Sequence, residues 1–348
     1  MGTCGDGQRQ PCRNAGTLTL HDMGYVNISE IEQALLAALG DAAAAKQLAQ
    51  QARPAVWLQT GRVEREAQIA LGSTKLGGSP DLPVGTRWPL RTAYPDAASR
   101  GQYPRASERP FQARLRSEFP LNFLAQINFA QLHAAADLGE DWPRQGLLSI
   151  FYDLTEQPWG HSPADAVGLK LLYSDEAAGP LQRLPQPEAL QALPAHWHMA
   201  PLQCSLHACV TPLPVAAAEW KQQAQMLERD VQDSYADWCE AEAEPAVNGK
   251  SWACHHAGGW PTPIQGDMQT QCALVAAGLD SGKGEHWCDP ATQAVRDGAR
   301  DWLLLLQIGS DEKSTINWGD EGQLYLWIRR EDLRARRFDR AQLVLQCY

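Results

Sequence analysis

The chain has 348 residues, a formal net charge of −11 at pH 7, nine cysteines and thirteen tryptophans. This length suits about two domains, or one large duplicated domain. An acidic surface repels phosphate backbones, so we expect no nucleic-acid partner. No apolar run reaches the roughly 20 residues of a membrane span. Residues 1–27 lack the order of a signal peptide and are predicted to form a loose leader. We therefore expect a cytoplasmic protein with free thiols and no membrane partner.

In chain order, the first predicted element is a helix from about residue 29 to 51. It opens with the capping box Ser29-Glu30-Ile31-Glu32, and Gly40 is a candidate interruption. Residues 92–120 are rich in Arg and Pro and are predicted to be a long loop. A second helix, with an acidic face, is predicted over about 214–243. The predicted strands are Phe123–Ile127, Leu147–Tyr152, Gly168–Tyr173, Leu206–Val210, Trp302–Ile308, Gln323–Ile328 and Gln342–Cys347.

An internal repeat is the strongest signal in the sequence. Gly77-Gly78-Ser79-Pro80 recurs as Gly258-Gly259-Trp260-Pro261, and Leu124-Ala125-Gln126-Ile127 recurs as Leu305-Leu306-Gln307-Ile308. Both pairs of blocks are 181 residues apart, which chance matches would rarely produce. The block that begins at Gly146 recurs from Gly322, so one loop of the second copy is five residues shorter.

The predicted fold is α+β and internally duplicated, with two mostly antiparallel sheet units, flanking helices and a crevice between the units. Residues 28–213 would form the first unit with its N-terminal helix. Residues 214–348 would form the second unit, preceded by the acidic helix. Together the units would make one compact pseudo-twofold domain.

Several ordered motifs across about residues 55–348 resemble the YwqG-like proteins, a bacterial family of unknown function. The motifs are Gly77-Gly78-x-Pro80 with Trp88-Pro89, Phe123-Leu124-x-Gln126-Ile127, Gly146-Leu147-x-x-Ile150-Phe151, Gly258-Gly259-x-Pro261 with Gln265-Gly266, Leu306-Gln307-Ile308, Trp318-Gly319-Asp320-x-Gly322-x-Leu324-Tyr325 and Asp332-Leu333. The resemblance implies an α+β fold with internal duplication and no assigned activity. It also implies genes that lie near polymorphic toxin and secretion loci, which points to immunity or accessory roles.

Two pairs of reactive side chains precede the Gly-Gly turns. Ser73 and Lys75 stand before the first turn, and Cys254 and His256 stand at the same positions before the second, with His255 between them. Each pair could be a nucleophile with a base. However, residues i and i+2 of a strand are about 6.6 Å apart, which exceeds hydrogen-bond reach. We therefore expect these side chains to cap backbone groups or to line the crevice.

Metal binding is a weaker alternative. Cys254, His255, His256, Cys272, His286 and Cys288 lie within 35 residues, and Cys204, His207 and Cys209 form a second group. Zinc sites in proteins usually use two closely spaced Cys or His doublets. Neither group has this spacing, so we predict no metal and no cofactor.

Gln126 and Gln307 follow apolar residues in equivalent strands. A buried amide must form hydrogen bonds, so each glutamine would tie down a neighbouring loop or contact a ligand in the crevice. Asp311, Trp318 and Asp320 flank the segment 309–319. They are predicted to form a structured turn, with an exposed Trp318 anchor for a partner protein as the alternative.

We predict no catalytic residues and a non-enzymatic binding protein, in particular an immunity or accessory protein of a toxin or secretion system. Its protein partner would be a basic toxin domain that meets the acidic helix. The alternative is a hydrolase or small-molecule-binding protein that uses the crevice. The candidate binding residues are Lys75, Gln126, His255, His256, Gln265, Gln307, Asp311, Trp318 and Asp320. The candidate turn residues are Gly77, Gly78, Pro80, Gly258, Gly259 and Pro261.

Overall fold

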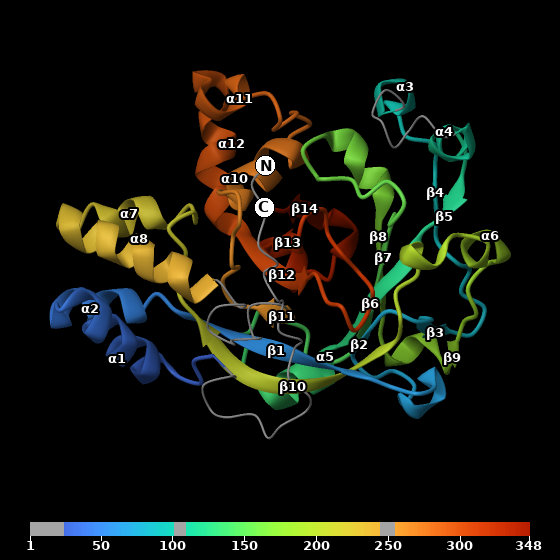
Figure 1. Cartoon of the computed structure of the whole chain (residues 1–348), viewed down its shortest axis with the longest axis horizontal. Helices are drawn as coiled ribbons and strands as arrows, with labels where there is room; N and C mark the ends of the chain where they lie inside the picture. Colours follow the sequence, from blue (N-terminus) through green and yellow to red (C-terminus); the bar gives the residue numbers. More distant parts are fainter. Residues whose placement is uncertain (1–23, 101–108, 244–254) are drawn as a thin grey trace, which may run out of the picture.

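A computed structural model describes residues 24–100, 109–243 and 255–348 (Figure 1). The predicted leader therefore lies almost wholly outside the described residues, as do Cys254 and residues 101–108. Among the described residues, no helix is long and apolar enough to cross a membrane.

Ten strands form one sheet, in which every adjacent pair is antiparallel, in the order β14-β13-β12-β11-β1-β10-β2-β6-β7-β8. The strands are β1 (Arg53–Arg62), β2 (Lys75–Leu76), β6 (Asn122–Asn128), β7 (Leu147–Tyr152), β8 (Leu169–Ser174), β10 (Leu202–Thr211), β11 (His255–Gly258), β12 (Trp302–Gly309), β13 (Gln323–Arg329) and β14 (Gln342–Gln346). The seven strands predicted from the sequence are all present, with ends shifted by a few residues at most. The sequence did not predict β1, β2 or β11.

The centre of the sheet is the long pair β1–β10, which runs from Arg53 opposite Thr211 to Arg62 opposite Leu202. On its two sides, β1 pairs with β11, and β10 pairs with β2. The prediction of two separate sheet units was therefore wrong, because β1 and β10 join both groups of outer strands into one continuous sheet. In Figure 1 this sheet curls strongly, so that the terminal strands β8 and β14 approach each other.

Alternation along the strands places the core inside the curl. In β13, Leu324, Leu326 and Ile328 belong to one large buried cluster to which most strands contribute. Their neighbours Tyr325 and Trp327 lie on the outer face, in a second cluster with α10 (Met268–Ala276). Since successive side chains of a strand point to opposite faces, the continuous apolar runs of the outer strands reflect burial on both faces.

The predicted first helix is two helices, α1 (Ile28–Leu39) and α2 (Ala42–Ala49). Asn27, rather than Ser29, caps α1 through a hydrogen bond from the Glu30 N–H. Gly40 ends α1 with a φ of 66°, a conformation that suits glycine, so it does interrupt the helix. The predicted second helix is likewise divided, into α7 (Trp220–Ala224) and α8 (Arg229–Ala243). These helices pack together around a buried cluster that includes Ile31, Leu48 and Tyr235.

Short elements complete the described chain. The segment 92–120 is not simply a loop, because it contains α3 (Ala97–Arg100), α4 (Arg109–Leu115) and β5 (Phe119–Pro120), which pairs with β4 (Leu90–Arg91). A second small sheet joins β3 (Asp81–Pro83) to β9 (Leu181–Arg183). The remaining short helices are α5 (Phe129–Ala135), α6 (Glu188–Gln191), α11 (Glu285–Cys288), α12 (Gln293–Asp297), α13 (Arg330–Arg334) and the 3₁₀ helices η2 (Glu66–Gln68), η4 (Pro163–Gly168), η5 (Glu176–Ala178), η6 (Ala195–Trp197), η8 (Pro290–Thr292), η9 (Gly298–Asp301) and η10 (Phe338–Arg340).

Candidate functional site

Gln126 joins the first Gly-Gly turn to the sheet. It lies in β6, opposite Lys75 of β2, and is fully buried. Its Oε1 accepts a hydrogen bond from the Asp81 N–H at 2.9 Å. Its Nε2 donates to the Ser73 carbonyl at 2.7 Å and to Asp81 Oδ2 at 2.9 Å. The amide therefore satisfies backbone groups on both sides of the turn, which is the structural role that a buried amide requires.

Gln307 makes the corresponding contacts in the second half. It lies in β12, opposite His256 of β11, and is also fully buried. Its Oε1 accepts from the Thr262 N–H at 2.9 Å, and its Nε2 donates to Thr262 Oγ1 at 2.7 Å. Thr262 and Asp81 are 181 residues apart, as are the two glutamines. Both glutamines thus hold the residue that follows a Gly-Gly-x-Pro turn.

Lys75 is fully buried and ion-paired. Its Nζ donates to Glu66 at 2.9 Å and to the Ser79 carbonyl at 2.5 Å, and lies 3.8 Å from Asp81. Arg183 of β9 donates to the same Asp81 at 2.8 Å. Burial lowers the pKa of Lys75, although its contacts with Glu66 and Asp81 oppose that shift. Burial alone would raise the pKa of Asp81, but Arg183 and Lys75 hold it below its usual range. Two cations and two carboxylates therefore balance at this turn.

His256 occupies the matching position in the second half, and it is buried. Its Nε2 lies 3.1 Å from the Trp260 carbonyl, and a carbonyl can only accept, so Nε2 carries a proton and donates it. Lys75 and His256 thus each bind the carbonyl of the fourth residue after them. With no exposed surface, neither side chain is accessible as a nucleophile or base.

His255 and Asp311 form a second buried pair, joined by Thr60 of β1. His255 Nδ1 accepts from the Gly309 N–H at 3.2 Å, so its Nε2 carries the proton that is donated to Asp311 at 3.1 Å. Thr60 Oγ1 donates to the same carboxylate at 2.8 Å. Burial raises the pKa of Asp311, but these donors, chiefly His255, outweigh it and hold the pKa well below its usual range.

This arrangement is not a catalytic triad. In a triad the imidazole accepts the proton of the hydroxyl group, whereas here the Thr60 hydroxyl donates directly to the carboxylate. Both ring nitrogens of His255 are already engaged. The three side chains instead fix the start of the segment 309–319 against β1.

The other candidates from the sequence are structural or lie apart. Trp318 is fully buried beside Tyr152, so the alternative of an exposed anchor was wrong. Gln265 is exposed, and its Nε2 donates to the Cys347 carbonyl at 2.7 Å. Asp320 is exposed on the turn before β13. The structure therefore does not bring Gln265 and Asp320 together with the buried residues in one site.

The Gly-Gly turns need glycine. Gly77, Gly78, Gly258 and Gly259 have φ values of 64° to 74°. At Gly77 a side chain would also meet the Ala200 carbonyl at 2.3 Å. Pro80 and Pro261 follow these pairs and are buried. All six predicted turn residues thus lie in the two turns held by Gln126 and Gln307.

The candidate cysteine sites do not hold a metal. Cys204 and Cys209 are an odd number of residues apart in β10, so their side chains lie on opposite faces of the strand. Burial raises the pKa of each thiol to about 12, which keeps the thiols protonated. Across residues 24–100, 109–243 and 255–348, no group of three or more His, Cys, Asp or Glu side chains is arranged to hold a metal ion.

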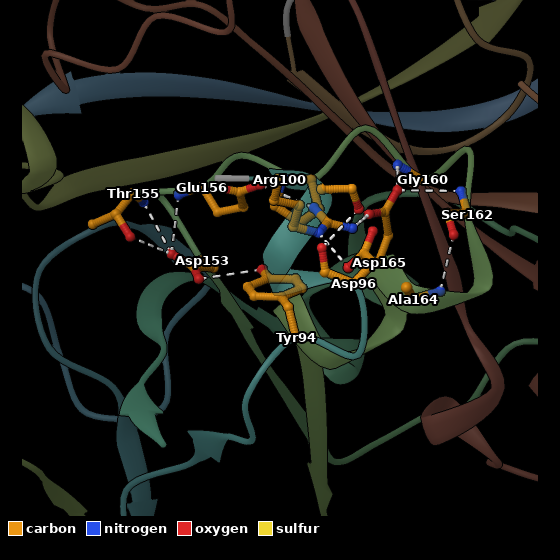
Figure 2. Close-up of polar contacts among 12 residues, drawn as sticks. Tyr94, Asp96, Arg100, Asp153, Thr155, Glu156, Gly160, Ser162, Ala164 and Asp165 are labelled. Carbon is orange, nitrogen blue, oxygen red and sulfur yellow. Dashed lines mark hydrogen bonds and ion pairs between the residues drawn. The ribbon is translucent and has the colours of Figure 1, made fainter. Parts of the chain in front are cut away.

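A polar cluster that the sequence did not reveal lies near the terminal strand β8 (Figure 2). Arg100, the last residue of α3, donates to Asp96 at 2.7 Å, to Glu156 at 3.0 Å and to Asp165 of η4. Burial raises the pKa of Glu156, and the hydrogen bond from Arg100 offsets this only in part. One guanidinium therefore holds three carboxylates from three separate segments.

Beside this cluster, Asp153 accepts from Tyr94 at 3.2 Å and from Arg91 at 2.6 Å. Asp165 also accepts from the Gly160 N–H at 2.8 Å and so orders the loop between β7 and η4 (Figure 2). The Arg/Pro-rich composition of residues 92–120 was the only sequence signal for this cluster, and it was interpreted as a loop.

These features define a class of protein: an α+β protein whose single antiparallel sheet is nearly closed into a barrel, with matched polar contacts behind two glycine turns. The domain of unknown function DUF1963 matches residues 74–347, and the chain belongs to that family. The matched range begins in the first turn and includes both glutamines, the Arg100 cluster and β14. No curated protein matches this sequence.

Proposed function

We propose that this protein is a non-enzymatic, cytoplasmic binding protein that acts through its surface. The observation that carries the proposal is the state of the candidate reactive residues. Lys75, His255 and His256 are buried and bonded within the fold, so they are not positioned to meet a substrate. A binding role needs no such group, and it relies on surface charge and shape.

We also propose that the chain is internally duplicated and is a YwqG-like protein. The support for duplication is that contacts recur at a constant spacing of 181 residues, in the pairs Gln126 with Asp81 and Gln307 with Thr262. A further recurrence is the backbone N–H of Asn128, which donates to Thr74, and that of Gly309, which donates to His255. The support for the YwqG-like assignment is the ordered set of motifs, and it carries with it the proposed immunity or accessory role.

The proposed binding surface is the outer side of α8. Asp230, Asp233, Asp237 and Glu240 are exposed, and their spacing of three or four residues places them along one side of the helix. Together with the net charge of −11, this carboxylate row would attract a basic partner such as a toxin domain.

The test is co-expression with the product of each adjacent gene, followed by kinetic binding measurements on the complexes. A variant that neutralises α8 (Asp230→Asn, Asp233→Asn and Asp237→Asn) should associate about tenfold more slowly at low salt, with a smaller effect at high salt. The matched control neutralises three exposed carboxylates elsewhere (Glu64→Gln, Glu118→Gln and Glu140→Gln) and should bind normally.

Two results would count against the proposal. Equal slowing in both triple variants would show that only net charge matters and would remove α8 as the binding surface. Failure of every adjacent gene product to bind, together with no protection of cells from a linked toxin, would remove the immunity role.

A further inference from the structure

The terminal strands of the sheet enclose a small cavity. Leu169, Lys170 and Leu171 of β8 line one wall, and Ala341, Gln342 and Leu343 line the other. The volume is about 200 Å³. We call this space the seam cavity. It lies where closure of the barrel would require β8 and β14 to pair, and the two strands form no such pair.

The β8 wall presents backbone groups without a protein partner. The Asp153 N–H donates to the Gly168 carbonyl at 2.9 Å, which sets the alternation of the β7–β8 ladder. Lys170 and Leu172 therefore bond to β7, while the N–H and carbonyl groups of Leu171 point away from it, toward the seam. Among the described residues, neither group of Leu171 has a backbone partner on that side. Leu171 is only 5% exposed.

The β14 wall is similar. The Leu345 N–H donates out of the sheet to the Trp159 carbonyl at 3.1 Å, so Leu343, two residues earlier, also points outward. The Leu343 N–H has no backbone partner within the described parts of the chain, and the residue is 4% exposed. Buried backbone groups are almost always paired, with protein, water or a ligand. Both walls of the seam cavity therefore offer unused hydrogen-bonding capacity to whatever occupies it.

An extended peptide fits these requirements. Its own N–H and carbonyl groups alternate to the two sides, so one short strand can bond to Leu171 on one side and Leu343 on the other. The cavity is smaller than the roughly 300–1,000 Å³ of typical ligand pockets, so only about two or three residues can enter. Lys170 and Asp339 at the rim form no ion pair among the described residues, and their charges complement the two ends of a short peptide.

We propose that the seam cavity binds a short extended peptide segment that adds a strand between β8 and β14. The segment could be a free peptide or part of a longer chain, and both sources present the same backbone chemistry. This site uses no residue of α8, so its failure in a test would leave the surface-binding proposal untouched.

The experiment uses the full-length protein and the tripeptide valyl-threonyl-valine, in a free form and in a form with acetylated and amidated ends. Backbone amide spectra should show saturable shifts at Leu171 and Leu343, with half-saturation on the order of 1 mM. In the unliganded protein the Leu171 amide should exchange with solvent at least about tenfold faster than the paired Leu172 amide, and binding should slow it.

The outcomes separate the two sources. Binding of the blocked form supports a segment of a longer chain, and binding of the free form alone supports a free peptide. In the second case Lys170→Glu should weaken binding several-fold, while Lys221→Glu, an exposed control, should not. Ala341→Phe should fill the cavity and abolish binding of either form. If Ala341→Phe fails to fold, a tripeptide N-methylated at its central residue provides the same test, since it lacks one N–H donor. Unmoved Leu171 and Leu343 amides with both peptides, or equal protection of Leu171 and Leu172, would overturn the proposal.

Discussion

Lys75 and His256 each face a buried glutamine across the sheet, and each donates a hydrogen bond to the carbonyl of the fourth residue after it. An ammonium group and an imidazole thus do the same structural work in the two halves. The requirement at this position is a long side chain with a donor that can reach the glycine turn. This explains why two residues with catalytic potential are placed where no substrate can reach them.

Replacing either glutamine should destabilise the fold by a similar amount. Gln126→Ala would leave the Asp81 N–H unpaired in a buried position, and Gln307→Ala would do the same to the Thr262 N–H. Each loss should lower the free energy of unfolding by about 1–3 kcal/mol. Urea denaturation measures this, with the exposed Gln203→Ala as the control. A loss in one half only would contradict the matched roles.

Asp311 should make stability depend on acid pH. Because its donors hold its pKa below that of an unfolded Asp, the carboxylate stabilises the fold above the unfolded value. This contribution should be lost as pH falls from about 4 to 2. Asp311→Asn should therefore be less stable than the natural protein at neutral pH and should lose less on acidification. Asp320→Asn, at an exposed carboxylate, should keep the natural pH profile in thermal melts. Identical slopes for Asp311→Asn and the natural protein would refute this account.

Arg100 should be the most sensitive residue of the polar cluster in Figure 2. Arg100→Met would leave Asp96, Glu156 and Asp165 close together without their cation. Removing one partner of a buried ion pair typically costs about 3–5 kcal/mol, which chemical denaturation would detect. A loss below about 1 kcal/mol would indicate that the cluster is solvated in solution.

Glu156 should have the opposite pH signature to Asp311. Burial raises its pKa, so the folded state binds the extra proton and loses stability as pH rises above the ordinary value of a glutamate, about 4.3. Glu156→Gln should remove this loss, because the amide oxygen can still accept from Arg100. Thermal melts from acid to neutral pH would show a flatter profile, and an unchanged profile would contradict the assignment.

Gly160 should tolerate no side chain. Its φ is 78°, and an added Cβ would lie 1.9 Å from the Leu343 carbonyl oxygen, which belongs to β14. Gly85 has a φ of 88° with open space around it, so Gly85→Ala should cost only the backbone strain of about 1–2 kcal/mol. Gly160→Ala should cost clearly more in urea denaturation. Equal costs would show that the loop moves away from β14 without penalty.

Local sequence patterns identified much of the secondary structure. The apolar runs of β6, β7, β12 and β13 were visible because these strands are buried on both faces. β1 was missed although it is central, and β2 and β11 were missed because each is very short. The pairing of β1 with β11 and of β10 with β2 joins segments far apart in the chain, which no local pattern encodes.

The sequence by itself determined which positions correspond between the halves, because the constant spacing of Gly77 with Gly258 and of Gln126 with Gln307 is a property of the chain alone. It could not determine whether Lys75, His256 and Trp318 face solvent or the core. Only the tertiary structure decided that, since burial depends on segments hundreds of residues apart that cover the same side chain. The same holds for the seam cavity, which exists because the curl of the whole sheet brings β8 to β14 without pairing them.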